Sequence, residues 1–295
     1  MTHDSRLRRI LHFPLTWLAI GVVGVGAASA FTGAGPLAAL ASAIAALVIY
    51  AVVMRVVAGR PLAELAPGRA VRETLLGVAI GTGFIVITVG AITLLGGYRF
   101  TLDGAAGLSA LPALVAVAIG GAVTEELLFR GLALQAIERL GGSWIALLVT
   151  AGLFGLVHAA NPGATLWSSI AIAVEAGLML GAGFLWRRSL WFVFALHATW
   201  NGLEQALGIP VSGHVAPGML VATVDGSPLL TGGAFGLEGS PVTVVTGLAL
   251  AAAMLVLAHR RGRLVPLRHG RHIPRRRSRQ AEPGGIGSAP ELSRR

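Results

Sequence analysis

Three short groups of polar residues interrupt apolar stretches of this 295-residue sequence. They are Glu125-Glu126 with Arg130, Phe154-x-x-x-His158 and His197-x-x-x-Asn201. A charged side chain in the hydrocarbon region of a membrane is costly, so it is retained there mainly for function. Together the three groups offer a carboxylate that can act as a general base, imidazoles that orient water or bind a metal, and an amide that donates to an oxyanion.

Helical spacing divides the first group into two parts. Glu126 and Arg130 are four residues apart and share one helix face, so we expect them to pair, which lowers the cost of burying both charges. Glu125 points about 100° away from its neighbour and is therefore free to face a site between helices. We predict Glu125 as the general base and Glu126 as its support.

The two histidine groups repeat this spacing. His197 and Asn201 share one helix face, and Phe154 and His158 share another. A lone histidine on an apolar helix is more often a hydrogen-bonded core residue than a ligand, and Asn201 alone can serve as a polar contact between helices. Glu175, on a further apolar stretch, either partners such a group or faces water. Buried polar groups on three separate spans are most simply satisfied by one another, or by a shared water or metal.

Several other polar residues are expected to be peripheral. We expect Glu204 to be a solvated charge near the outer membrane surface, and we expect no role for His214 or His259. Arg130 lies near the end of its span, where its side chain can extend to the interface.

The sequence lacks cysteine and two common motifs of hydrolases. It contains no cysteine, which excludes a disulfide, a thiolate zinc site and a cysteine nucleophile. It also contains neither a Gly-x-Ser-x-Gly elbow nor a His-Glu-x-x-His motif. If the polar groups form a catalytic site, the expected nucleophile is water.

The composition is that of a polytopic membrane protein. The chain is 55% hydrophobic and 12% charged, with a mean hydropathy of +0.76, whereas an average soluble domain is about 25% charged. The net charge of +10 is concentrated in the N-terminal arm and after Ala258. This distribution argues against a basic core that binds nucleic acid, and we expect no nucleic-acid partner.

Eight apolar stretches have about the length needed to cross a bilayer. They cover residues 13–31, 37–57, 73–95, 110–137, 143–159, 165–186, 190–207 and 242–258. Nearly all arginines fall in alternate connections and in the two ends of the chain, which would place these on one side. By the positive-inside rule, the sequence predicts an all-α, polytopic membrane bundle of about eight transmembrane helices with both termini in the cytoplasm.

The predicted domain organisation follows from these spans. Residues 1–12 form a cytoplasmic arm, residues 13–258 form the membrane domain with its core at about 110–207, and residues 259–295 form a disordered basic cytoplasmic tail. The connection 208–241 is rich in glycine and proline without a clear period, so it is either partly re-entrant or lies on the membrane face. Gly77-x-x-x-Gly81 would allow two helices to approach closely.

The three motifs, in this order on successive spans, resemble the CPBP family. This family comprises the type II CAAX prenyl endopeptidases and their bacterial relatives, also called Abi or lysostaphin-resistance-like proteins. The resemblance covers about residues 111–207 and implies an intramembrane endopeptidase with an eight-helix, all-α fold. It further implies the following roles: Glu125 and His158 activate the attacking water, His197 and Asn201 form the oxyanion hole, and Glu126, Arg130 and Phe154 are supporting residues.

The resemblance also bears on cofactor and substrate. The family is often described as metal-dependent, which would make zinc or another divalent metal the cofactor and Glu125, His158 and His197 its ligands. A metal-free glutamate mechanism has also been argued, and the sequence does not decide between them. The composition is typical of bacteria, which generally lack protein prenylation. We therefore expect a multi-pass protein of the bacterial plasma membrane, surrounded by lipid, that cleaves a membrane-associated peptide or protein.

Two other classes of function remain open at this point. A transporter could use buried glutamate and histidine side chains as a proton or cation relay, but it would be expected to show internal repeats, and none is evident. A membrane scaffold with a vestigial site is the other alternative, against which the intact set of motifs argues. The sequence does not indicate the oligomeric state.

Overall fold

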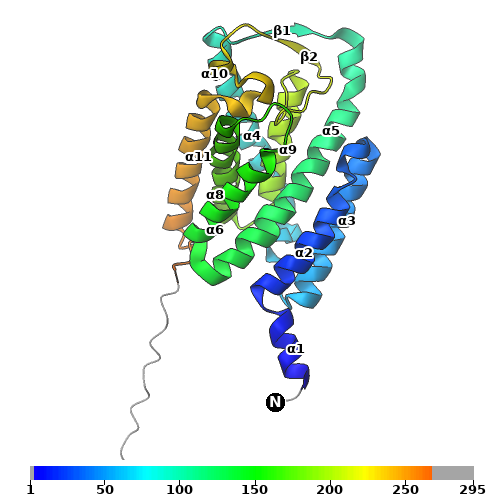
Figure 1. Cartoon of the computed structure of the whole chain (residues 1–295), viewed down its shortest axis with the longest axis vertical. Helices are drawn as coiled ribbons and strands as arrows, with labels where there is room; N and C mark the ends of the chain where they lie inside the picture. The colour runs from blue at the N-terminus through cyan, green and yellow to red at the C-terminus, as the bar shows by residue number, and fades with distance from the viewer. Residues whose placement is uncertain (1–2, 268–295) are drawn as a thin grey trace, which may run out of the picture.

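The structure is a computed structural model that describes residues 3–267, apart from the side chains of residues 3–5 and 104–106, and it shows a bundle of long helices (Figure 1). The α-helices are α1 (His3–Leu11), α2 (Pro14–Ser29), α3 (Pro36–Val52), α4 (Ala70–Leu94), α5 (Gly104–Glu126), α6 (Leu134–His158), α7 (Leu166–Ile172), α8 (Met179–Arg187), α9 (Leu190–Ala206), α10 (Pro228–Thr231) and α11 (Pro241–Arg260). The predicted all-α membrane bundle is confirmed.

Shorter segments extend or connect these helices. Three π-helical segments are η2 (Val53–Val57), η5 (Leu127–Ala133) and η6 (Ala173–Leu178), and five 3₁₀ turns are η1 (Thr32–Ala34), η3 (Ala63–Leu65), η4 (Pro67–Arg69), η7 (Gly233–Phe235) and η8 (Leu237–Gly239). The strands β1 (Tyr98–Leu102) and β2 (Leu220–Val224) pair antiparallel, with Tyr98 opposite Val224. This ribbon was not predicted, because both strands lie in connections between the predicted spans.

Six helical segments within residues 3–267 are long and apolar enough to cross a membrane. One of them, Gly107–His158, has 52 residues. It turns back at Gly142 (φ 81°), a backbone conformation that favours glycine, so it forms two antiparallel legs (Figure 1). The predicted break between the fourth and fifth spans at Gly141-Gly142 is therefore present. Helix α9, with 17 residues, is not among these six segments, and the exact number of crossings stays a prediction.

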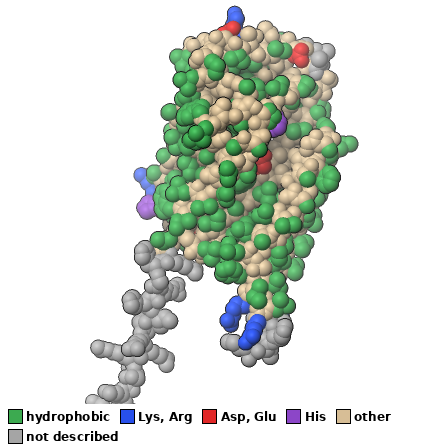
Figure 2. All heavy atoms as spheres, viewed as in Figure 1, with side chains coloured by type: hydrophobic (Ala, Val, Ile, Leu, Met, Phe, Trp, Pro, Cys, Tyr) green, Lys and Arg blue, Asp and Glu red, His purple; other side chains and the backbone are tan. Residues whose placement is uncertain are grey.

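Apolar side chains cover the sides of the bundle, and charged ones gather at its ends (Figure 2). Leu37, Val56 and Leu75 are examples of large hydrophobic residues that are more than half exposed. Such a surface is unfavourable in water and favourable in lipid. The chain is therefore an integral, multi-pass membrane protein.

Helices α4 and α9 pack along each other through small residues. A Cβ atom added at Gly81 would lie 2.9 Å from the carbonyl oxygen of Leu196, and one added at Gly77 would collide with the carbonyl oxygen of Phe192. The predicted close approach at the Gly77-x-x-x-Gly81 motif is confirmed. It matters for the site because α9 carries His197 and Asn201.

Ion pairs join the helices at the arginine-rich end of the bundle, the lower end in Figure 1. Glu73 accepts hydrogen bonds from Arg187 Nε at 2.8 Å and Arg69 Nη2 at 3.2 Å. Glu138 accepts from Arg188 Nη2 at 2.7 Å. These buried or half-buried pairs connect α4, α6 and the turn that precedes α9.

Part of the predicted disordered tail is ordered. Helix α11 continues to Arg260, and Arg263 Nη1 donates to the carbonyl oxygen of Trp186 at 2.6 Å. Val265 N donates to Ser143 Oγ at 2.8 Å, and Ser143 N donates to the carbonyl oxygen of Val265 at 2.9 Å. The prediction of disorder is wrong for residues 259–267, because the backbone hydrogen bonds hold them against the turn at Gly142. The remainder of the predicted tail, residues 268–295, lies outside the described residues.

Candidate active site

Glu125 and Glu126 are the last two residues of α5, and the π-helical turn η5 follows them directly. Such turns within α-helices occur frequently at functional sites. Because adjacent side chains on a helix diverge, the two carboxylates have different surroundings. Glu126 is fully buried in the bundle, whereas the side chain of Glu125 is 34% exposed and lines a cavity.

A single carboxylate oxygen of Glu126 accepts hydrogen bonds from side chains of two other helical segments. Its Oε1 accepts a hydrogen bond from Arg130 Nη1 at 2.8 Å and another from His197 Nδ1 at 2.8 Å. The expected pairing of Glu126 with Arg130 is present. Glu126 also positions His197. Helical spacing could not reveal this contact, since His197 lies on a different helix, α9.

Arg130 is buried, with 1% of its surface exposed, and it does not extend to the membrane interface. Its Nη2 atom donates to the carbonyl oxygens of Ala176 at 3.0 Å and Gly177 at 3.1 Å. Its guanidinium carbon lies 4.9 Å from the centre of the Phe154 ring. The expectation of an interfacial Arg130 is wrong, because the π-helical segment η6 presents these carbonyl groups inside the bundle. Arg130 thereby fixes η5 to η6.

His158, at the end of α6, is positioned by its neighbour one turn earlier. Its ring stacks on Phe154 with a centroid separation of 4.4 Å, and its Nδ1 lies 2.7 Å from the carbonyl oxygen of Phe154. A carbonyl only accepts hydrogen bonds, so Nδ1 carries the proton. In the neutral ring, Nε2 is then an acceptor that can bind a water molecule.

His197 lies between the two adjacent carboxylates. Its Nδ1 is held by Glu126, and its Nε2 lies 4.0 Å from Glu125 Oε2. No described residue donates a hydrogen bond to that buried Glu125 oxygen, or to Asn201 Oδ1. Both groups are therefore available to a ligand.

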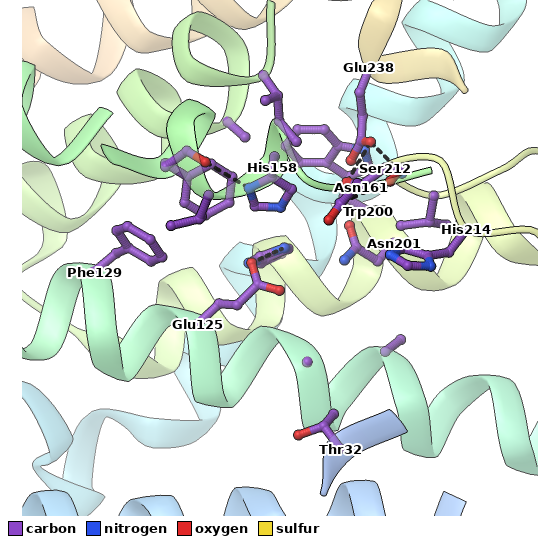
Figure 3. A pocket seen from close by; sticks show the side chains of 18 of the residues that line it. Thr32, Glu125, Phe129, His158, Asn161, Trp200, Asn201, Ser212, His214 and Glu238 are labelled. Atoms are coloured by element: carbon purple, nitrogen blue, oxygen red, sulfur yellow. Dashed lines mark hydrogen bonds and ion pairs between the residues drawn. The ribbon is translucent and has the colours of Figure 1, made fainter. Parts of the chain in front are cut away.

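The predicted motif residues converge on one cavity of about 830 Å³. Its walls include Glu125, Phe154, His158, His197 and Asn201, whereas Glu126 and Arg130 lie behind them. Figure 3 shows Glu125 and His158 facing one another, with Asn201 beside them. Figure 2 shows a hollow in the apolar side of the molecule in which acidic and histidine side chains are visible. The cavity is thus reached from the membrane-facing side.

The connection after α9 supplies further polar groups that the sequence analysis did not assign. Ser212, His214 and Glu238 line the cavity, together with Asn161 from the turn after α6. Ser212 N and Oγ donate to Glu238 Oε2 at 2.6 and 2.7 Å. Burial raises the pKa of the Glu238 carboxyl to about 7, against the lowering effect of these hydrogen bonds. His214 lies in the cavity wall, and the expectation that it has no role stays a prediction.

Glu204 and Glu175 are both fully buried. Glu204 accepts hydrogen bonds from Trp200 Nε1 and from the backbone N–H of Leu237, each at 3.0 Å. The expectation that Glu204 is solvated is therefore wrong, because the connection after α9 folds over it. No described residue donates to either carboxylate oxygen of Glu175, which does not line the cavity. The structure does not join Glu175 to the motif residues.

The donor set does not form a metal site in this arrangement. Within residues 3–267, no group of three or more His, Asp or Glu side chains is placed so that it could hold a metal ion. His197 Nδ1 and His158 Nδ1 are also both engaged, with Glu126 and with a backbone carbonyl. The metal stays a prediction, and the chemistry proposed below uses no step through one.

Comparison with protein families places the motifs in a known context. Residues 107–203 match the family model described as type II CAAX prenyl endopeptidase Rce1-like. The chain carries an Rce1-like domain. This domain extends from α5 to α9 and contains all three motifs, in agreement with the predicted resemblance. No curated protein and no solved structure matches the chain.

The Rce1-like family implies CAAX-type intramembrane endopeptidase activity in general terms. The matched segment is about a third of the chain. Ser212, His214 and Glu238 lie beyond its C-terminal end, so the family match assigns nothing to them.

Proposed function

We propose that this protein hydrolyses a peptide bond of a membrane-associated peptide or protein, with a water molecule activated by Glu125 and His158. The observation that carries this proposal is the convergence of Glu125, His158, His197 and Asn201, from three helices, on one cavity within an Rce1-like domain. The open side of the cavity suits a substrate that arrives through the lipid.

The first step is attack of water on the substrate carbonyl. Glu125 Oε2, which has no protein donor, accepts one proton of the water, and His158 Nε2 accepts a hydrogen bond from the other. As the oxygen–carbon bond forms, the carbonyl oxygen becomes an oxyanion. Glu125 then returns its proton to the leaving nitrogen, the carbon–nitrogen bond breaks, and an acid and an amine leave.

The oxyanion needs hydrogen-bond donors, and two side chains can supply them. Asn201 Nδ2 is one donor and His197 Nε2 is the other. Because His197 Nδ1 already donates to Glu126, donation from Nε2 requires a proton on both ring nitrogens. Glu126 and Glu125 lie on either side of the ring and balance its positive charge. Arg130 in turn holds Glu126 in place. The buried pair therefore serves to position His197.

The proposed location is the bacterial plasma membrane, and the proposed substrate class is a membrane-anchored peptide or protein. A metal, if present, would be an addition to this scheme.

The test is cleavage of a library of membrane-anchored peptides by the purified protein in lipid. The products are identified by mass spectrometry for the wild type, for Glu125→Ala and for His158→Ala, each with and without a chelator. Cleavage by the wild type alone supports the proposal, and loss of cleavage with chelator would show a metal requirement. Cleavage that survives either substitution contradicts the mechanism.

A further inference from the structure

Glu238 is a second carboxylate in the wall of the cavity, and it comes from outside the Rce1-like domain. It lies in η8, in the connection between β2 and α11, and 2% of its surface is exposed. Figure 3 shows it near Ser212, Asn161 and His214, on the opposite side of the cavity from Phe129. The mechanism described above makes no use of it.

The hydrogen bonds of Glu238 leave one of its oxygens available. Ser212 donates to Oε2 through both its backbone N–H and its hydroxyl group. Asn161 Nδ2 donates to the carbonyl oxygen of Ser212 at 3.0 Å and so fixes the position of Ser212. No residue in the described part of the chain donates to Glu238 Oε1. A role limited to holding the connection in place would need only Oε2.

The charges around the cavity favour a cation. The described cavity wall contains the carboxylates of Glu125 and Glu238, three histidines and no arginine. The charge that the mechanism gives to one of them, His197, is paired with Glu126 behind the wall. The buried Arg130, which packs against the cavity residue Phe154, is already bonded to Glu126 and to two backbone carbonyls. Two further acceptors in the wall, Glu125 Oε2 and Asn201 Oδ1, also receive no hydrogen bond from the protein. A low-dielectric cavity with an excess of anionic acceptors attracts a positively charged group that carries donors.

We propose that Glu238 binds a lysine or arginine side chain of the substrate and thereby selects which peptide bond is cleaved. This inference rests on the proposed endopeptidase function and adds a specificity that the Rce1-like domain alone does not carry. The basic residue lies on the side of the scissile bond that is nearer to the connection between α9 and α11. Glu125 remains free for the catalytic water, because Glu238 approaches the cavity from another element.

The test uses pairs of membrane-anchored peptides that differ at one position, with lysine in one and neutral N-acetyl-lysine in the other. The position is varied along both sides of the cleaved bond, and kcat/KM is measured with the full-length protein in lipid. At one position, the wild type should prefer lysine by on the order of tenfold, as expected for a hydrogen bond to a charged group. Glu238→Gln can still accept both hydrogen bonds from Ser212 but has no charge, so its ratio should fall to about one.

Two control variants test whether the ratio of kcat/KM between the two peptides depends on the charge of Glu238. Ser212→Ala removes one donor to Glu238 but keeps its carboxylate, so the preference for lysine should persist. Asp225→Asn removes another carboxylate of the same end of the bundle, one that is paired with Arg99 and is not in the cavity wall, and should also preserve the preference. Because each ratio is measured within one enzyme preparation, partial loss of folded protein does not change it.

A binding measurement separates failure of this inference from failure of the proposed function. The same peptide pairs are given a fluorescent label. Their dissociation constants are measured for the single variant Glu125→Gln and for the double variant that also carries Glu238→Gln. Tighter binding of the lysine peptide that depends on Glu238 supports the inference even if the wild type cleaves nothing. Cleavage that depends on Glu125 but is equal for both peptides at every position, or a preference that Glu238→Gln leaves unchanged, overturns it.

Discussion

Adjacent residues at the end of α5 have separate roles because of helix geometry. Glu126 points into the bundle, where Arg130 and His197 share its Oε1 atom. Glu125 points into the cavity and keeps an oxygen without a protein donor. Glu126 is therefore a buried structural anion that positions a histidine, and Glu125 is the candidate base.

The pair of Glu126 and Arg130 should behave as one unit in stability measurements. Arg130→Met leaves Glu126 as a buried charge without its main partner, and should cost roughly 3–5 kcal/mol of unfolding free energy. Glu126→Gln combined with Arg130→Met removes both charges, and should recover at least half of that loss. Thermal or denaturant unfolding in lipid or detergent measures both. Losses that simply add in the double variant would show that the two side chains are not coupled.

Sequence spacing predicted this pair and the shared cavity, but not the residues that complete them. The i, i+4 spacing of Glu126 and Arg130 is a local property of one helix. The contacts of Glu126 with His197, and of Arg130 with Ala176, depend on how α5, α9 and η6 pack. Glu238 and Ser212 lie in a connection without periodicity, where nothing in the sequence indicates which residues turn inward. A buried Glu204 was missed for the same reason, since the connection that covers it has no recognisable pattern.

At the scale of the elements, helix boundaries were predictable where prolines and glycines interrupt apolar stretches. Pro36 and Pro241 stand at the first position of α3 and α11, and Gly142 separates the two legs of the longest helical segment. The ribbon of β1 and β2 was not predictable, because its two short strands are 118 residues apart, from Leu102 to Leu220, and the second lies in a glycine-rich connection. The π-helical segments were also not predicted. Their widened turns leave carbonyl groups that find partners, such as Arg130, only when the helices pack together.

The close contact of α4 with α9 predicts that a larger residue on α4 would displace the candidate catalytic residues on α9. Gly77→Ala should reduce stability by about 1–3 kcal/mol and lower activity, because the added methyl group meets the backbone of Phe192 and Leu196 and displaces the helix that carries His197. Gly83→Ala is the matched control on the same helix. A Cβ atom there meets nothing within 4 Å, so this variant should be neutral or slightly more stable. Equal effects of the two substitutions on unfolding and cleavage would contradict this assignment.

At the scale of the whole molecule, the ribbon of β1 and β2 lies at one end of the bundle, opposite the N-terminal helix α1 (Figure 1). The arginine ion pairs lie at the end away from the ribbon. By the positive-inside rule, we predict that the arginine-rich end faces the cytoplasm. In this predicted orientation, the connection between α9 and α11 faces the outer side of the membrane. This orientation determines from which side the polar part of a substrate approaches Glu238.

The absence of cysteine from the chain makes the orientation directly measurable. Leu102→Cys places a thiol in the exposed ribbon, where the native side chain is 85% exposed, and Arg261→Cys places one at the arginine-rich end. A membrane-impermeant thiol reagent should label Leu102→Cys in intact cells. It should label Arg261→Cys only after the membrane is opened. The opposite pattern would invert the orientation, and equal labelling of both in intact cells would contradict a single orientation.

The claim at the centre of this account is that Glu125 is the general base for water. The most direct measurement is kcat for the best-cleaved membrane-anchored peptide, compared between the wild type and Glu125→Gln at equal amounts of folded protein. The substitution keeps size and hydrogen bonding but removes the base, so kcat should fall by about 10²–10⁴-fold. A fall of less than about tenfold would contradict the account, because that range is the contribution expected of a general base.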